Sequence, residues 1–188
     1  MLCGIRAIPV QVEVDISTGL PAFEMVGYLS SEVREAKERV RTALHNCGVS
    51  LPAKRITINL SPGNVRKTGT GFDLPIAVAL LSAIGVLDEM CSRQKVFVGE
   101  LNLSGQLLPV NGILPVVSDG CRDGVHTDFI IPMDNLAEGE LVRDASVYGF
   151  SSLEAVIAYL RGGAYEKPAL TMLSAESVSG VDFAEVNG

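Results

Sequence analysis

The chain contains no tryptophan, and aromatic residues make up only 5% of its 188 residues. Its hydrophobic content of 47% is therefore mostly aliphatic, which is typical of a compact mixed α/β domain. A chain of this length can bury one core with a short appendage. We therefore expect one aliphatic α/β domain.

Metal-binding side chains are also scarce. The cysteines and histidines are widely separated, and no CxxC pair occurs. They are Cys3, Cys47, Cys91, Cys121, His45 and His126. Because a structural zinc site needs about four converging ligands, we expect no metal site. The cysteines are expected to be free, mostly buried thiols in a reducing cytosol.

Long hydrophobic runs are absent as well. The longest apolar stretch, Leu74 to Leu87, is interrupted by Pro75 and Gly85 and is too short to span a bilayer. No basic segment followed by an apolar one opens the chain, so no signal peptide is expected. We expect a cytoplasmic protein with no membrane partner.

The common catalytic motifs are missing too. No Gly-Lys-Ser/Thr of a P-loop, no GxSxG elbow and no Ser-His-Asp pattern occurs. The nearest candidate phosphate site is Gly69-Thr70-Gly71, because a glycine-rich turn before a helix exposes N–H groups. Asp73, at the start of that helix, would satisfy these groups itself and repel a phosphate. A simple capped helix is the favoured interpretation, and an anion site is the alternative.

The net charge of -7 is distributed unevenly. Residues 1–70 hold nine basic and six acidic residues, whereas the remainder holds six basic and sixteen acidic ones. Lys54 and Arg55 open a predicted strand, and Arg66 and Lys67 lie in the loop after it. Two interpretations stand: an ordinary solvated edge, or a patch that contacts DNA phosphates if the loop brings the two pairs together.

Hydrophobic patterning predicts the main elements. Alternation predicts a strand over 10–16, joined through a turn at 19–21 to a second strand over 22–26, antiparallel if the turn is a hairpin. Three- and four-residue spacing predicts a helix that begins after a cap at Ser30 or Ser31 and ends near Gly48. The other predicted elements are strands at 54–60, 95–98 and 129–131, a turn or hairpin at 102–108, and helices at 73–84, 111–122 and 152–160.

Several motifs occur in a fixed order along the chain. They are GLPAFEMVG (19–27), VREAKERVRTAL (33–44), KRITINLSP (54–62), GFDLPIAVALLSA (71–83), VGELNLSGQLLPVNGILP (98–115) and FIIPMDN (129–135). Together they resemble the opening domain of the ComM-type, Mg-chelatase-like AAA+ ATPases over roughly residues 4–160. The resemblance implies an α/β (α+β) fold like that of the Lon protease domain and ribosomal-protein domains, a mixed sheet packed with helices. A more distant resemblance links it to the C-terminal domain of RadA.

In the Lon proteases, which this domain also resembles, a serine and a lysine form the catalytic dyad. The serine lies in a glycine-rich loop before a helix, and the lysine follows an LPxGG turn. The matching positions here hold Gly71 and Leu114, which have no hydroxyl and no amine. The resemblance therefore implies Lon-like architecture without a peptidase site, and no cofactor in this chain.

Residues 163–188 are small, polar and acidic, which predicts a linker after a domain of residues 1–162. The segment VDFAEVNG (181–188) resembles the stretch that leads into the AAA+ module in this family. A short stretch that family members have before Gly4 is missing. We expect a truncated chain whose ATPase module, with its ATP and Mg, is absent.

The resemblance implies a non-catalytic accessory domain of a ring-shaped DNA motor, with self-association into a hexamer and DNA as a candidate partner. One alternative is a hydrolase, a Lon-like peptidase of an unusual type, which would need a nucleophile–base pair. The other is a Mg-chelatase component in tetrapyrrole synthesis, which would need a porphyrin pocket or metal ligands.

Overall fold

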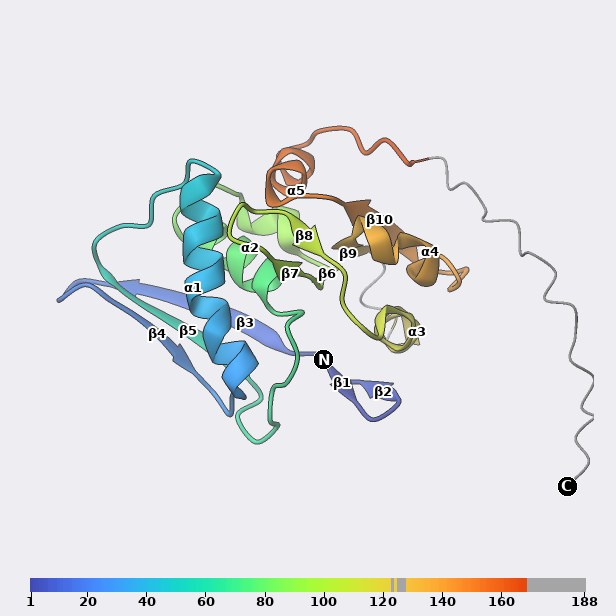
Figure 1. Cartoon of the computed structure of the whole chain (residues 1–188), viewed down its shortest axis with the longest axis horizontal. Helices are drawn as coiled ribbons and strands as arrows, with labels where there is room; N and C mark the ends of the chain where they lie inside the picture. Colours follow the sequence, from blue (N-terminus) through green and yellow to red (C-terminus); the bar gives the residue numbers. More distant parts are fainter. Residues whose placement is uncertain (123, 125–127, 169–188) are drawn as a thin grey trace, which may run out of the picture.

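The computed structural model describes residues 1–122, 124 and 128–168 as a mixed α/β fold (Figure 1). The helices are α1 (Ser31–Asn46), α2 (Asp73–Ala83), α3 (Ile113–Arg122), α4 (Leu136–Gly139) and α5 (Leu153–Leu160), with 3-10 turns η1 (Glu89–Ser92) and η2 (Met133–Asn135). The strands are β1 (Leu2–Cys3), β2 (Arg6–Ala7), β3 (Gln11–Ser17), β4 (Ala22–Val26), β5 (Arg55–Ser61), β6 (Lys95–Phe97), β7 (Glu100–Leu101), β8 (Leu107–Leu108), β9 (Asp128–Pro132) and β10 (Ser146–Phe150). The predicted α/β (α+β) class is confirmed.

The first sheet has the order β3-β5-β4, so the predicted hairpin between residues 10–16 and 22–26 is wrong. Strand β5 lies between them, antiparallel to β3 and parallel to β4. Its inward side chains Ile56, Ile58 and Leu60 are all buried, which suits the central position. The parallel β4–β5 pair is connected by α1, as a parallel crossover requires.

The second sheet, β10-β9-β6, is entirely parallel. Its central strand β9 carries three consecutive buried residues, Phe129, Ile130 and Ile131, as expected for a strand covered on both faces. The predicted hairpin at 102–108 is present as the antiparallel pair β7–β8. A second small hairpin, β1–β2, was not predicted from the sequence.

Helix α1 buries the predicted apolar stripe against the core. Its buried residues are Val33, Ala36, Val40, Ala43 and Leu44. Ser30 occupies the predicted N-cap position, but its buried hydroxyl makes no capping hydrogen bond to the first turn, and Ser31 is the first residue of the helix. The Ser30 N–H instead donates to the Lys67 carbonyl, because the loop after β5 returns beside this turn.

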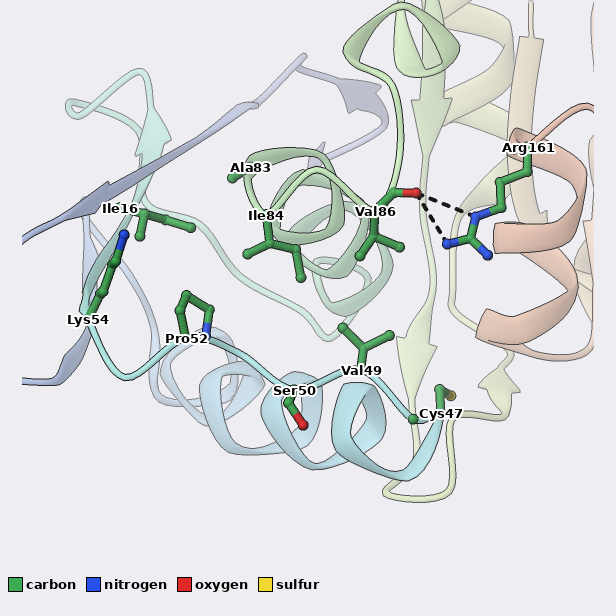
Figure 2. Close-up of a pocket in the computed structure, with 11 residues that line it drawn as sticks. Ile16, Cys47, Val49, Ser50, Pro52, Lys54, Ala83, Ile84, Val86 and Arg161 are labelled. Carbon is green, nitrogen blue, oxygen red and sulfur yellow. Dashed lines mark hydrogen bonds between the residues drawn. The ribbon is translucent and has the colours of Figure 1, made fainter.

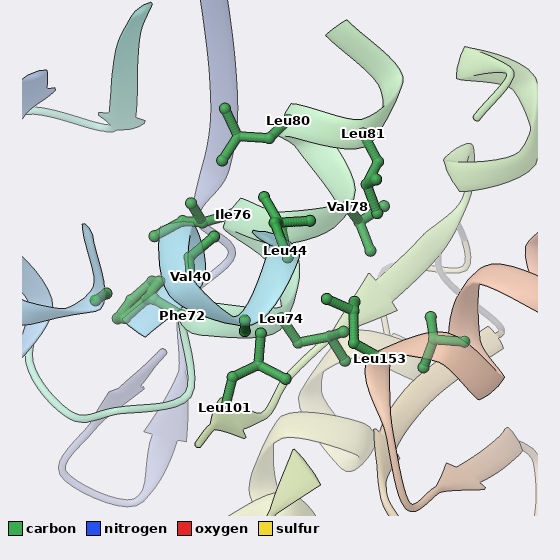
Figure 3. Packing of buried hydrophobic residues seen from close by; sticks show 14 of the residues in the cluster. Val40, Leu44, Phe72, Leu74, Ile76, Val78, Leu80, Leu81, Leu101 and Leu153 are labelled. Atoms are coloured by element: carbon green, nitrogen blue, oxygen red, sulfur yellow. The ribbon is translucent and has the colours of Figure 1, made fainter. Parts of the chain in front are cut away.

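Helix α2 is the buried centre of the molecule, as its apolar sequence predicted. It contacts α1, β3, β6 and β7. Figure 3 shows its leucines meeting Val40 and Leu44 of α1, Leu101 of β7 and Leu153 of α5. One continuous core therefore joins both sheets through this helix.

The chain after α5 still contacts the fold. Tyr165 accepts a hydrogen bond from the Gly149 N–H at 3.0 Å, and its ring lies 5.0 Å from that of Tyr148. The Lys167 ammonium lies 2.7 Å from a Glu140 carboxylate oxygen. Packing thus extends past the boundary predicted at residue 162, while most of the predicted linker (169–188) lies outside the described residues.

Two further expectations concern the cysteines and the membrane. Cys3 is exposed and Cys47, Cys91 and Cys121 are half-buried, so the expectation of mostly buried thiols is not met. Within the described ranges, no helix combines the length and the apolar character that crossing a bilayer requires.

Candidate functional site

The position that matches the dyad serine lies at the junction of two chain segments. The Gly71 carbonyl accepts from the Gly99 N–H at 3.1 Å, and the Leu74 N–H donates to the Gly99 carbonyl at 3.0 Å. These bonds tie the start of α2 to the residue before β7. A Cβ added at Gly71 would lie 3.0 Å from a methyl of Val98, so a larger side chain here would crowd its neighbours.

The position that matches the dyad lysine lies in the first turn of α3. The Leu114 side chain is 39% exposed, and its N–H donates to Glu138 at 2.9 Å. The buried Asn135 side chain, in the 3-10 turn η2, bonds to Val110 in the loop before this helix. It accepts from the Val110 N–H and donates to the Val110 carbonyl, both at 2.9 Å. The turn is therefore held rigidly, but it presents an apolar side chain where a base would be needed.

A cavity of about 670 Å³ opens beside Gly71. Its wall is mostly apolar and comes from the N-terminal hairpin, β3, α2, β6 and α3, with Val12, Phe72, Val78, Phe97, Val98, Val110 and Val116 among the lining residues. Its two charged side chains are already paired. Lys95 contacts Asp128 at 2.8 Å, and Asp119 accepts from Ala7 and Arg122. No histidine is among these lining residues, and Leu114 is not one of them.

Asp119 fastens the β1–β2 hairpin to α3 at the edge of this cavity. One carboxylate oxygen accepts from the Ala7 N–H at 2.7 Å, and the other lies 2.7 Å from Arg122 and 3.5 Å from Arg6. The Ala7 bond, followed by the two arginines, lowers the pKa of Asp119. The hairpin is thus held by a carboxylate in its ionised form.

This attachment predicts an acid-induced release of the hairpin. A carboxyl group whose pKa is lowered by folding stabilises the fold at pH values above its unfolded-state pKa, which is near 4. This stabilisation is lost as the pH falls through the folded-state pKa. Below about pH 4, the NMR chemical shift of the Ala7 amide should therefore change towards that of a solvent-exposed amide. Asp119→Asn should abolish the transition; an identical titration in that variant would contradict the assignment.

Asp73 does not cap α2, so that prediction is wrong. The residue before the helix is Phe72, with no side-chain cap, and the Asp73 carboxylate is fully buried. It accepts from Arg39 Nε at 2.7 Å, from Arg39 Nη2 at 3.0 Å and from the Leu101 N–H at 3.0 Å. A guanidinium fork and a backbone donor together occupy the carboxylate more fully than the first-turn amides would. The bond to Asp73 in turn raises the pKa of Arg39.

The four predicted DNA-contacting cations do not converge. Lys54 and Arg55 lie where β5 begins, whereas Arg66 and Lys67 lie beyond its carboxyl end, beside Tyr28. A seven-residue strand separates the two pairs by about 20 Å. The loop returns to Tyr28 rather than to the start of β5, so the condition under which the four cations would form one patch is not met.

The individual environments of these cations also differ. Arg55 pairs with Glu24 at 2.9 Å, and Arg66 lies 6.0 Å from the centre of the Tyr28 ring. Lys67 is fully buried, and its ammonium donates to the Pro62 carbonyl. Lys54 is exposed on the rim of a second groove. Lys67 therefore cannot reach a surface phosphate from this position.

Sequence reasoning missed the bond between Arg39 and Asp73. The i,i+4 spacing of Glu35 and Arg39 indicates an ion pair on the helix surface, and that contact exists at 3.8 Å, but the shorter bonds of Arg39 go to Asp73. The available signal was a lone carboxylate opening an otherwise apolar helix. Such a residue is buried only with a partner.

The chain matches known proteins across this whole region. A family model described as subunit ChlI of Mg-chelatase matches residues 12–135. Competence protein ComM of Haemophilus influenzae is 41% identical over 159 residues, covering 85% of this chain and 31% of the relative. The chain thus spans about a third of that relative's length.

Two more distant relatives fit the fold described above. Lon protease 1 of Bacillus subtilis is 29% identical over 131 residues, covering 66% of this chain and 16% of the relative. DNA repair protein RadA of Streptococcus pneumoniae is 30% identical over 97 residues, covering 52% of this chain and 22% of the relative. Both support a related, Lon-like fold. On the family match over residues 12–135, the chain belongs to the Mg-chelatase ChlI-subunit family and forms a ComM-like, Lon-related domain of it.

Proposed function

We propose that this chain is a non-catalytic accessory domain of a ring-forming AAA+ DNA motor of the ComM type. The observation that carries the proposal is the state of the dyad positions. Gly71 supplies no nucleophile, Leu114 supplies no base, and the charged groups of the adjacent cavity are engaged in ion pairs. The domain retains a Lon-like frame while its reactive groups are absent.

The remaining parts of the proposal follow from the relatives. ATP and Mg bind to a separate ATPase module, which accounts for the two thirds of the ComM length that this chain does not span. The motor assembles as a hexamer in the cytoplasm and acts on DNA during transformation, as the name competence protein suggests, by branch migration. This domain contributes to ring assembly, to DNA engagement, or to both.

Three of the four candidate cations support the proposed DNA contact. Lys54, Arg55 and Arg66 have exposed side chains, whereas Lys67 is withdrawn into the core. Three phosphate contacts correspond to a log–log salt slope of about -2.7 for one domain. A ring multiplies this weak contact through avidity, so the full-length assembly is the right protein to test.

Reversing these charges tests the DNA role. In the full-length protein, Lys54→Glu/Arg55→Glu/Arg66→Glu is expected to weaken fork-DNA binding by about tenfold at moderate salt and to flatten the salt slope. Binding is measured by fluorescence anisotropy across a salt series.

A matched triple variant, Arg41→Glu/Arg93→Glu/Arg143→Glu, makes the same charge change at other exposed positions. It should affect binding less. If the first variant retains both the affinity and the slope, the three cations do not contact DNA, and ring assembly is the remaining role.

A further inference from the structure

The cavity beside Gly71 lies between the outer strands of the two sheets. Strand β3 ends the order β3-β5-β4 and β6 ends the order β10-β9-β6, so each has one edge that pairs with no other described strand. Residues 95–98 line the cavity without interruption, and so do residues 9–12. Because successive side chains of a strand point to opposite faces, such an unbroken run means that the backbone edge itself faces the cavity. Two unpaired sheet edges therefore face the same space.

The hydrogen bonds of β6 show which of its backbone groups are free. The Val98 N–H donates to the Ile130 carbonyl of β9 at 3.0 Å, so Val98 and Val96 turn their backbone groups towards β9. Since these groups alternate along a strand, those of Lys95 and Phe97 point away from β9. Within the described part of the chain, no backbone partner meets them there. Unpaired N–H and C=O groups in an apolar cavity cost free energy, which a ligand with matching donors and acceptors recovers.

The free edge of β3 continues a ladder that the N-terminal hairpin begins. The Met1 amino group donates to the Ile8 carbonyl at 2.9 Å, and the Ile8 N–H donates to the Met1 carbonyl at 2.8 Å. This pair follows Leu2–Ala7 in the register, so the next positions are residues 9–12, whose free edge no described residue pairs with. The N-terminus lies beside the start of β3 (Figure 1). A strand placed in line with β1 therefore runs antiparallel to β3 and enters the cavity.

The size and the lining of the cavity define its ligand. At a rise of about 3.4 Å, with about 4.8 Å between strands and about 10 Å between layers, one strand residue fills about 160 Å³. The cavity volume of about 670 Å³ thus corresponds to about four residues. Helices α2 and α3 contribute the apolar side chains of Phe72, Val78 and Val116 to its wall. Both charged side chains of the lining are engaged in ion pairs, so the enclosed part of a matching ligand is uncharged and apolar.

We infer that this cavity binds an extended peptide segment of a partner protein, with about four uncharged apolar residues inserted as a strand between β3 and β6. An unpaired edge is a template for pairing with another chain, and here two edges offer one strand partners on both sides. A lipid or another apolar small molecule matches the wall but leaves both edges unpaired. The site lies apart from the exposed cations of the proposed DNA contact and does not depend on that role.

The second groove, of about 790 Å³, lacks this feature. Figure 2 shows its lining, which includes the segment 47–54 and the end of α2. That helix end is already closed, because the Val86 N–H donates to the Leu81 carbonyl at 2.9 Å. The Val86 carbonyl accepts from Arg161 at 3.3 Å. No strand edge of the described residues opens along this groove, so it does not offer a second place for strand addition.

A short peptide tests the site in the full 188-residue chain. The probe is the fluorescein-labelled peptide KSVIVASK, whose four central residues are apolar and mostly β-branched. Its matched control carries N-methyl groups on two alternate central residues, which keeps the side chains but removes two N–H donors. Binding is measured by fluorescence anisotropy. The control should bind about thirtyfold more weakly, the factor expected for the loss of two backbone hydrogen bonds.

A substitution in α2 tests the location. Ala79 lines the cavity, so Ala79→Phe fills the space and should weaken binding of the probe by about tenfold or more. Ala83→Phe makes the same change one turn later, at an exposed position outside this lining, and should leave the affinity unchanged. In the complex with the parent chain, the Phe97 N–H should exchange with solvent about tenfold more slowly, which NMR measures even if Ala79→Phe does not fold.

A tethered strand provides an independent variant. The segment VIVA fused directly ahead of Met1 falls opposite residues 9–12 in the register of the hairpin, at a high effective concentration. It should protect the Phe97 N–H without added peptide, and it should block binding of the free probe.

Three results would overturn the proposal. Equal affinity of the probe and its N-methylated control would show that apolar contact alone drives binding, as for a lipid. An unchanged affinity in a folded Ala79→Phe variant would place the peptide outside the cavity. A Phe97 N–H that stays unprotected both in the fused chain and with saturating probe would show that no strand adds to β6.

Discussion

Replacing Asp73 with alanine is expected to lower the free energy of unfolding by about 3 to 5 kcal/mol. The change leaves the Arg39 guanidinium, whose side chain is only 19% exposed, without its buried carboxylate, and the Leu101 N–H without its acceptor. Because one kcal/mol corresponds to about 2 to 4 °C in a chain of this size, the melting temperature should fall by about 10 °C. Urea titration and thermal unfolding measure the two quantities.

An exposed ion pair provides the control for this prediction. Glu24→Ala removes the partner of Arg55, where both side chains are about half exposed, and should cost less than about 1 kcal/mol. An Asp73→Ala variant as stable as Glu24→Ala would show that the buried pair contributes no net stability.

Replacing Lys67 with glutamate is expected to destabilise the fold by about 3 kcal/mol or more. The side chain is fully buried, and its ammonium donates to the Pro62 carbonyl, an acceptor that a carboxylate cannot pair with. Hydrogen bonds of the Lys67 backbone to Tyr28 and Ser30, at 2.8 and 3.0 Å, hold this position in place, so the new side chain cannot readily move into solvent. Denaturant unfolding of the two proteins at neutral pH measures the loss.

Lys67→Met separates burial from charge. Methionine fills the same space but leaves the Pro62 carbonyl unpaired, so a smaller loss of about 1 to 3 kcal/mol is expected. Burial lowers the pKa of Lys67, so the unfolded chain binds more protons and stability should rise with pH between the folded and unfolded values. Lys67→Met should lack this rise. A glutamate variant as stable as the parent would place the side chain in solvent and restore it as a DNA contact.

The sequence predicted those elements whose identity depends on local pattern. The apolar stripe of α1, the all-apolar α2 and the buried alternation of β5 each specify their own type and face. The pairing of β3 with β4 was not predictable in the same way. A tight turn brings two strands close, but the more apolar β5 takes the central place between them, and its position depends on the return of the chain after α1.

The same distinction between local pattern and contacts with distant residues applies to the candidate site. Gly71 and Leu114 could be located through the resemblance to the Lon dyad motifs, and their side chains then show that a hydroxyl and an amine are absent at these positions. The environments of Arg39 and Lys67 could not, since Arg39 bonds to a residue 34 positions away and Lys67 is buried by a loop that returns to Tyr28. A cation on a helix or in a loop is solvated far more often than buried, so the burial of Lys67 had no sequence signal.

The most direct test of the proposed function is a hydrolysis assay on the chain itself. Fluorogenic casein and ATP are each incubated with the purified chain at micromolar concentration, and turnover is followed through successive purification steps. With glycine and leucine at the dyad positions and no P-loop in the sequence, no turnover should co-purify with the chain. Steady hydrolysis of either substrate that remains with the chain through repeated chromatography would contradict a non-catalytic accessory domain.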